Sequence, residues 1–291
     1  MDSLVSTAWL AAELGAADLG APDLAAPDLA APDLAIVDCT AFMPGSERDA
    51  ATEFAAAHIP GARFLDIAEV SDRSNPAPHM LPSAADFASA LEQLGVARDD
   101  RIVVYDNSPL RTAARGWFMV HHFGATQVAI LDGGLQKWVA EARPTESGAA
   151  QPRRARFAAA PAGKRIVAKA DVLAIGLPLI DARGAARFDG SEPDPRPGIA
   201  AGHIPGSRNL PFGALYKADG TFRSLEEIRA LFEAAGIDPA QPFVASCGSG
   251  VTANSLIFAA HLLGNDTARL YDGSWSEWGA DPSTPKESAG A

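Results

Sequence analysis

Cysteine and positive charge are both scarce in this chain. Only two of its 291 residues are cysteines, Cys39 and Cys247, and they lie far apart in the sequence. A disulfide framework and a cysteine-ligated zinc site therefore have no support. Lysine and arginine together number 24 against 36 aspartates and glutamates, which gives a net charge of -12 and an isoelectric point of about 4.9. This balance argues against binding to nucleic acid or to an anionic membrane, but it allows a local basic pocket for a small anion.

Long apolar runs are also missing. No run approaches the length of a transmembrane helix, and residues 1–3 do not start a signal peptide with a basic and then an apolar region. We therefore expect a cytoplasmic protein. The chain is 47% hydrophobic and 21% charged, so it can bury one large core or two ordinary ones.

A five-residue unit, Ala-Pro-Asp-Leu-Ala, occurs three times in succession at residues 21–35. A proline at every fifth position prevents a regular helix or a central strand, so we expect an exposed loop. A docking segment would be the functional interpretation. A tolerated low-complexity expansion is the simpler one, because the entropic cost of closing a loop grows slowly with its length.

The most informative stretch lies around Cys247. A strand-like run at 242–245 precedes it and a helical pattern at 255–263 follows, so we expect the cysteine at a strand-to-helix turn. Gly248 and Gly250 allow the backbone to fold tightly and to turn successive N–H groups inward, and the helix N-terminus adds a positive partial charge. Such a cradle favours an anion and therefore a reactive thiolate. A buried structural cysteine followed by a glycine-rich turn explains these residues equally well.

One sequence pattern occurs twice, at offsets of 140 to 145 residues. The repeated landmarks are an aspartate after a short strand, a His-Ile-Pro-Gly segment, the strand that leads to Cys247, and an Asp-Gly segment followed by tryptophan. They are found at Asp38 and Asp181, at 58–61 and 203–206, at 102–106 and 243–247, and at 131–138 and 271–278. The chain is therefore a tandem duplication, in which Asp106 takes the place of Cys247 in the first copy.

Each copy alternates short apolar strands with amphipathic helices, for example a helix at 84–94 before a strand at 102–105. This alternation predicts an α/β fold of two tandem domains, each a small, mostly parallel sheet flanked by helices, with ligands at the carboxyl ends of the strands. Prolines and a lack of periodicity mark a linker between them. We expect an N-terminal domain at 1–142, a linker at 143–170 and a C-terminal domain at 171–291.

The duplicated pattern resembles the rhodanese family, and specifically its two-domain sulfurtransferases. The matching features are Asp181-Ala182-Arg183, both His-Ile-Pro-Gly segments, the strand-to-cysteine loop and the closing Asp-Gly-x-x-x-x-Trp segment. The resemblance covers nearly the whole chain apart from the repeat at 21–35. In that family the first copy has usually lost its cysteine, so the resemblance implies that the domain with Asp106 is inactive and that Cys247 is catalytic.

The loop after Cys247 is similar to that of family members that use 3-mercaptopyruvate, whereas members that prefer thiosulfate typically carry arginine and lysine there. The resemblance implies that Cys247 takes the sulfur of 3-mercaptopyruvate as a persulfide, releases pyruvate, and passes the sulfur to cyanide or to a thiol acceptor such as thioredoxin. It implies no cofactor and no metal. The N–H groups of the loop would stabilise the charged sulfur; they belong to Gly248, Ser249, Gly250, Val251 and Thr252.

Arg187 and Arg196 match the two carboxylate-binding arginines of the family. A planar guanidinium can bind a carboxylate through two hydrogen bonds, which suits this role. The alternative is that both arginines are solvated loop charges. For Arg183, substrate binding and a structural ion pair are both open.

Enzymes that use 3-mercaptopyruvate have also been discussed as having a serine, histidine and aspartate relay, and the matching positions here are Ser249, His58 and Asp49. A hydroxyl beside the nucleophile could pass a proton to the departing enolate. Because His-Ile-Pro-Gly occurs in both copies, a common structural role for His58 and His203 is at least as good a hypothesis.

Three rival functions are weighed against this one. A cysteine phosphatase of related fold would have an arginine six positions after the cysteine, where this chain has Ala253. A thiosulfate:cyanide sulfurtransferase is the nearest competitor. A non-catalytic interaction protein of the same family is the third, but it would have no need of Cys247, Arg187 and Arg196 together.

Overall fold

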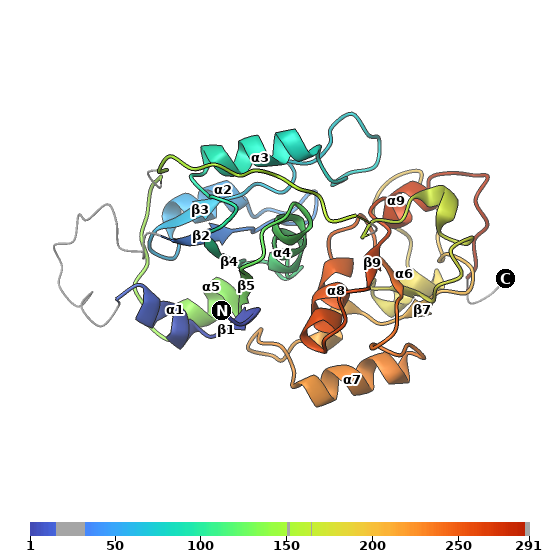
Figure 1. The fold of residues 1–291 in the computed structure, drawn as a ribbon. Helices are drawn as coiled ribbons and strands as arrows, with labels where there is room; N and C mark the ends of the chain where they lie inside the picture. Colours follow the sequence, from blue (N-terminus) through green and yellow to red (C-terminus); the bar gives the residue numbers. More distant parts are fainter. Residues whose placement is uncertain (16–32, 150–151, 164, 289–291) are drawn as a thin grey trace. The chain divides into compact units, whose positions relative to one another are not determined.

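A computed structural model describes residues 1–15, 33–149, 152–163 and 165–288 (Figure 1). The chain forms two compact units, each of which includes a short segment from the other half of the sequence. The first unit is Met1–Val70, Pro82–Ala162 and Ala218–Phe222, and the second is Ser71–Leu81, Gly163–Lys217 and Arg223–Ala291.

The first unit contains a five-stranded sheet in which each strand is parallel to its neighbours. In spatial order the strands are β1 (Leu4–Val5), β5 (Val128–Leu131), β4 (Arg101–Tyr105), β2 (Leu34–Asp38) and β3 (Ala62–Phe64). A parallel sheet needs crossover connections, and here helices supply them. They are α1 (Thr7–Glu13), α2 (Ala50–Ala56), α3 (Ala84–Gln93) and α4 (Ala113–His122), and a further helix, α5 (Gly134–Ala140), follows β5.

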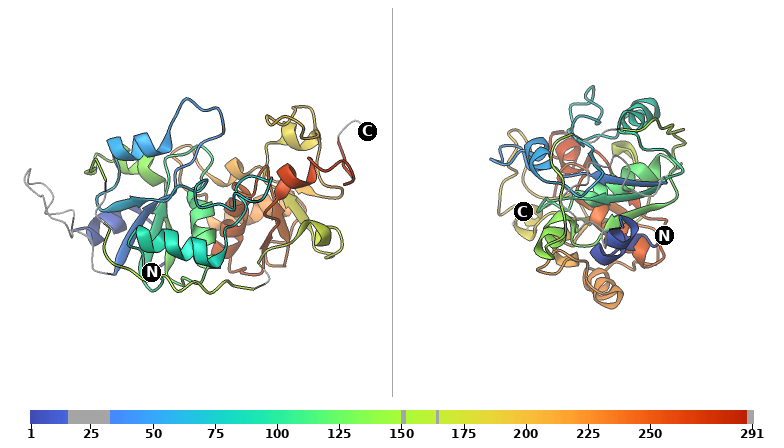
Figure 2. Two further views of the ribbon diagram at one scale, coloured as in Figure 1. Left: turned by 90° about the horizontal axis from the view of Figure 1, so that it is seen from above. Right: turned by 90° about the vertical axis from the view of Figure 1, so that its left-hand side faces the viewer.

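Helices cover both faces of this sheet, and Figure 2 shows α2 and α5 on one side and α3 on the other. Side chains alternate between the faces along a strand. Tyr105 of β4 therefore packs in a buried cluster with Phe54 of α2 and Trp138 of α5. On the opposite face, Gly116 of α4 lies against Cys39, which leaves no space for a side chain at 116.

The second unit repeats this sheet with four strands in the order β7 (Arg208–Asn209), β6 (Leu179–Asp181), β8 (Val244–Ser246) and β9 (Arg269–Leu270). The order matches β3-β2-β4-β5, and every pairing is again parallel. A parallel bridge between Ile166 and Leu270 takes the place of the β1 pairing. The prediction of two tandem α/β domains is therefore confirmed.

The helices of the second unit include two that frame the Cys247 loop. These are α8 (Ala253–Leu262), of which the first eight residues are buried, and the short α9 (Ser274–Trp278). The others are α6 (Ala185–Asp189), α7 (Leu225–Ala234) and the 3₁₀ turns η1 (Lys169–Asp171) and η2 (Phe212–Leu215). A capping box of Ser224 and Glu227 begins α7.

In each unit, the aspartate of the Asp-Gly landmark accepts a hydrogen bond from the short segment that comes from the other half of the sequence. Oδ1 of Asp132 accepts the N–H of Phe222 at 2.8 Å in the first unit. In the second unit, Oδ2 of Asp272 accepts the N–H of Leu81 at 2.6 Å. The duplication therefore extends to these contacts, and it brings residues 71–81 into the unit that contains Cys247.

Two expectations from the sequence remain, an exposed loop at residues 21–35 and the domain boundaries. Leu34 and Ala35, the end of the Ala-Pro-Asp-Leu repeat, belong to β2 rather than to a loop, because both are buried and pair with Arg101 and Ile102 of β4. Residues 21–32 of the repeat lie outside the described residues. The domain boundaries at 142 and 170 stay predictions. No helix in the described part of the chain is long and apolar enough to cross a membrane.

Candidate active site

Cys247 lies at the carboxyl end of β8, in the turn that leads to α8, and it is 1% exposed. Its backbone N–H donates to Oγ of Ser274 at 3.1 Å. The same hydroxyl lies 2.8 Å from the carbonyl oxygen of Tyr271 and 3.9 Å from the Cys247 sulfur. Ser274 begins α9 and was not singled out from the sequence. It fixes the base of the turn and places a hydroxyl beside the thiol.

The loop after Cys247 has the geometry of an anion-binding turn. Gly250 has a φ of 74°, and a Cβ there would collide with the carbonyl of Asp272, so this position requires glycine. The N–H groups of Gly248, Ser249, Val251 and Thr252 have no hydrogen-bond acceptor among the described residues. They are therefore available to an anion bound at the loop.

The two predicted substrate arginines lie beside this loop. Arg196 donates through Nη1 to the carbonyl oxygen of Gly248 at 2.9 Å. A Cβ built on Gly248 would lie 3.4 Å from Nη2 of Arg187 and 3.5 Å from Nη2 of Arg196. The structure thus brings both guanidinium groups to the residue that follows Cys247, and the absence of a side chain at 248 leaves room for them.

A buried carboxylate, Asp194, links the two arginines. Nη2 of Arg187 lies 2.7 Å from its Oδ2, and Arg196 binds both oxygens, with Nε 2.7 Å from Oδ1 and Nη2 2.8 Å from Oδ2. Burial raises the pKa of Asp194, but the hydrogen bonds from Arg196 and Arg187 more than offset this effect, and the pKa falls to about 2. Asp194 is therefore ionised at neutral pH.

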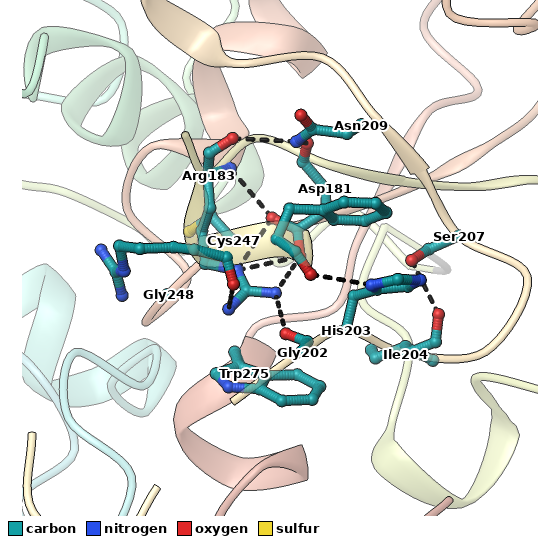
Figure 3. Close-up of polar contacts among 12 residues, drawn as sticks. Asp181, Arg183, Gly202, His203, Ile204, Ser207, Asn209, Cys247, Gly248 and Trp275 are labelled. Carbon is teal, nitrogen blue, oxygen red and sulfur yellow. Dashed lines mark hydrogen bonds and ion pairs between the residues drawn. The ribbon is translucent and has the colours of Figure 1, made fainter. Parts of the chain in front are cut away.

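The contacts of Arg183 are those of a structural ion pair and not those of a substrate-binding residue (Figure 3). Its Nε and Nη2 bind the carboxylate of Asp181 at 2.8 to 3.1 Å, and Nη2 also donates to the carbonyl of Gly202. The guanidinium lies over the ring of Trp275, 4.7 Å from its centre. Of the two roles open to it from the sequence, the structure supports the ion pair.

The hydroxyl of Ser249 faces a histidine that no repeated motif in the sequence points to. Nδ1 of His79 lies 3.0 Å from Oγ of Ser249, and His79 belongs to the segment 71–81 that the Asp272 contact holds. The backbone of His79 has a φ of 62°, a conformation that costs energy for any residue with a side chain. One sequence signal could have found it. His79 has no counterpart in the second copy, whereas His58 does.

His58 and His203 have equivalent surroundings in the two units. Nδ1 of His58 contacts the carbonyl of Phe54 at 2.7 Å, and its ring stacks on that phenylalanine at 4.0 Å. Nδ1 of His203 contacts the carbonyl of Phe188 at 2.8 Å, with a ring separation of 3.8 Å. These matched contacts support the hypothesis of a common structural role.

Asp49, the predicted third member of the relay, caps a helix. Its carboxylate accepts the N–H of Thr52 at the start of α2, at 2.8 Å. No hydrogen bond joins Asp49 to His58 in the described part of the first unit. The structure does not bring these two residues together, and the relay through Ser249, His58 and Asp49 stays a prediction without support from these contacts.

The loop of the first unit holds a carboxyl group where the second has its thiol. Oδ1 of Asp106 accepts the N–H of Ser108 at 2.9 Å, and Oδ2 accepts the N–H of Ala113 at 2.7 Å. Burial raises the pKa of Asp106. The other cysteine, Cys39, is fully buried, and burial raises the pKa of its thiol. Neither residue offers a nucleophile, which supports a single active loop at Cys247.

The described residues contain no cluster of three or more histidine, cysteine, aspartate or glutamate side chains that could hold a metal ion.

A cavity of about 530 Å³ opens beside Arg196, between residues 75–78 and α9. Its charged lining residues are Lys169, Arg196, Glu277 and Asp281.

Comparison with known proteins places these features in a family. The sequence profile of the rhodanese-like domain matches residues 22–141 and again 163–281. The human 3-mercaptopyruvate sulfurtransferase is 41% identical over 95% of this chain and 91% of its own, and that of Escherichia coli is 41% identical over 87% and 91%. A thiosulfate sulfurtransferase from Gallus gallus is also 41% identical, over 82% and 84%.

Solved structures agree with the sequence matches. The crystal structure of SseA from Escherichia coli, described as a 3-mercaptopyruvate sulfotransferase with the rhodanese fold, superposes with a TM-score of 0.81 at 37% identity. The similarity covers 95% of this chain and all of that one. The two matched domains, the shared fold and the Cys247 loop lead to one conclusion: this chain belongs to the rhodanese family.

Proposed function

We propose that the chain is a 3-mercaptopyruvate sulfurtransferase that works through a persulfide on Cys247. The observation that carries this proposal is the pair of arginines beside Gly248, because a guanidinium pair next to the nucleophile suits a donor that has a carboxylate as well as a sulfur. The loop itself has no cationic side chain from 248 to 252. The positive charge is therefore set to one side of the sulfur, where a carboxylate would lie.

In the first half of the reaction, the Cys247 thiolate attacks the sulfur of 3-mercaptopyruvate. A bond forms between the two sulfur atoms, the carbon–sulfur bond of the donor breaks, and its electron pair leaves with the carbon fragment as pyruvate enolate. The unpaired N–H groups of the loop stabilise negative charge on the outer sulfur. The enolate takes up a proton and is released as pyruvate.

Ser249 and His79 are placed to supply that proton. Their side chains lie 3.0 Å apart, so a proton given up by the hydroxyl can be replaced from the imidazole. This pair takes the part that the sequence analysis assigned to Ser249 with His58.

In the second half, an acceptor thiolate attacks the outer sulfur and Cys247 leaves as a thiolate, ready for another turn. A dithiol such as thioredoxin would then form its own disulfide and release hydrogen sulfide, while cyanide would become thiocyanate. A dithiol acceptor suits a reducing compartment, and we place the protein in the cytoplasm, as its two unpaired cysteines suggest.

Thiosulfate is the second candidate donor, because a relative named thiosulfate sulfurtransferase has the same 41% identity to this chain as the human 3-mercaptopyruvate enzyme, over a shorter part of it. The experiment is to measure kcat/KM with each donor, with cyanide as acceptor. We expect a clear preference for 3-mercaptopyruvate, lost entirely in Cys247→Ser. Arg187→Gly should impair the use of 3-mercaptopyruvate more than that of thiosulfate. A preference for thiosulfate in the wild-type protein would overturn the proposal.

A further inference from the structure

One carboxylate orients both arginines of the site. Asp194 is half-buried as a residue, but its side chain is only 1% exposed, and both oxygens are engaged. Besides the three contacts with guanidinium nitrogens, Oδ1 accepts the backbone N–H of Arg196 at 3.1 Å. The carboxylate therefore holds Arg196 through both its side chain and its backbone, and it holds Arg187 through one nitrogen. The flexible arginine side chains are fixed before a donor binds.

The same carboxylate sets the charge of the site. Two arginines carry two positive charges, and the ionised Asp194 cancels one of them. The cavity beside Arg196 adds no surplus positive charge, since Lys169 is paired with Asp281 at 2.9 Å and the remaining charged group of its lining besides Arg196 is Glu277. Near Gly248, the arginine cluster thus has a net charge of one.

Arg187 still has hydrogen-bonding capacity for a ligand. Its side chain is 21% exposed, and its one side-chain hydrogen bond to another described residue runs from Nη2 to Asp194, which leaves Nη1 available. A single carboxylate can therefore bind without displacing Asp194. A group with two negative charges would meet only one net positive charge.

We propose that Asp194 is a specificity-determining residue: it positions Arg187 and Arg196 and limits the site to donors that present one negative charge, such as a carboxylate, against doubly charged thiosulfate. This inference rests on the function proposed above. It assigns Asp194 no contact with the donor, because its effect is exerted through the two arginines.

Asp194→Asn tests this directly, since asparagine keeps the shape of the side chain and removes its charge. The ratio of kcat/KM for 3-mercaptopyruvate to kcat/KM for thiosulfate should fall by about tenfold, mainly through a lower KM for thiosulfate, and that KM should become more sensitive to salt. Asp194→Glu keeps the charge and should leave the ratio within about threefold of wild type while raising both KM values, because a longer side chain displaces the guanidinium groups.

Glu192→Gln is the matched control. It removes the same charge two residues away, its side chain is exposed, and the ion pairs of both arginines within the described part of the chain are with Asp194 and not with Glu192. Its donor ratio should equal that of the wild type. Equal losses for both donors in Asp194→Asn would show that Asp194 acts only in folding, and a shift as large in Glu192→Gln would show a general effect of charge. Either result overturns the inference.

If Asp194→Asn does not fold, inhibition of the wild-type protein by small anions tests the inference instead. At constant ionic strength, pyruvate should inhibit turnover of 3-mercaptopyruvate at lower concentration than sulfate does, and the reverse order would overturn the inference. Failure of the proposed function can be distinguished from failure of this inference. A wild-type protein that prefers thiosulfate, or uses neither donor, would contradict the function before any variant is compared.

Discussion

Removal of the buried guanidinium of Arg183 should destabilise the second unit severely. In Arg183→Met, Asp181 loses all three of its guanidinium contacts, and the two side chains are each 2% exposed, so water cannot replace them. Loss of one partner from a buried ion pair costs about 3 to 5 kcal/mol of unfolding free energy, because the other charge stays buried without compensation. The contact with Trp275 and the hydrogen bond to Gly202 are lost as well.

The free energy can be measured by hydrogen exchange in increasing denaturant, followed by mass spectrometry of peptides from β6 and β8. Arg48→Met, followed in peptides from β2 and β4 of the first unit, is the control, because Arg48 and Glu53 form a pair with side chains 40% and 31% exposed and should contribute less than about 1 kcal/mol. The double variant Asp181→Asn/Arg183→Met should recover much of the loss, since no charge stays unpaired. A cost for Arg183→Met no larger than that for Arg48→Met would refute the reasoning.

Three further predictions concern histidines and a buried carboxyl group. Replacing His58 or His203 by Asn should lower the melting temperature while leaving kcat within about threefold, because both rings serve packing; a loss of kcat confined to His58 would instead support the relay first predicted. His79→Asn should lower kcat with 3-mercaptopyruvate about a hundredfold through loss of proton supply to Ser249, and an unchanged kcat would exclude that role. Burial raises the pKa of Asp38 to about 6. The folded state therefore disfavours its charge, and the contribution of Asp38 to the free energy of unfolding falls by about 2 kcal/mol as pH rises from about 4 to 6. Asp38→Asn should abolish that fall in urea unfolding measured at both pH values, whereas a fall of the same size in the variant would rule Asp38 out as its source.

The duplication explains why so much of the fold could be predicted. Several elements predicted in one copy are supported by a counterpart in the other, as with α3 and α7 or β4 and β8. Comparison of the two copies also indicates where equivalent residues have different structural roles. Asp38 and Asp181 are repeated, yet Thr40 stands two positions after the first and Arg183 two positions after the second, so that among the described residues Asp181 has an ion-pair partner and Asp38 has none.

The residues that reach the site from elsewhere in the chain could not be predicted from local sequence pattern. His79 lies 170 positions from Ser249, and no periodicity links them. Ser274 approaches Cys247 only because α9 begins with a backbone φ of 50°. Asp194 stood in the arginine segment, but its link to both guanidinium groups depends on a loop conformation that composition does not define. These contacts are products of tertiary structure, whereas the strands, the helices and the Cys247 turn follow from local pattern.

The most direct test of the account is the mass of the protein after incubation with 3-mercaptopyruvate in the absence of an acceptor. We expect a gain of one sulfur atom, located in the peptide that contains Cys247 and removed by cyanide, together with one equivalent of pyruvate. Cys247→Ser should gain none. Sulfur bound to Cys39, or continued turnover by Cys247→Ser, would contradict the persulfide mechanism.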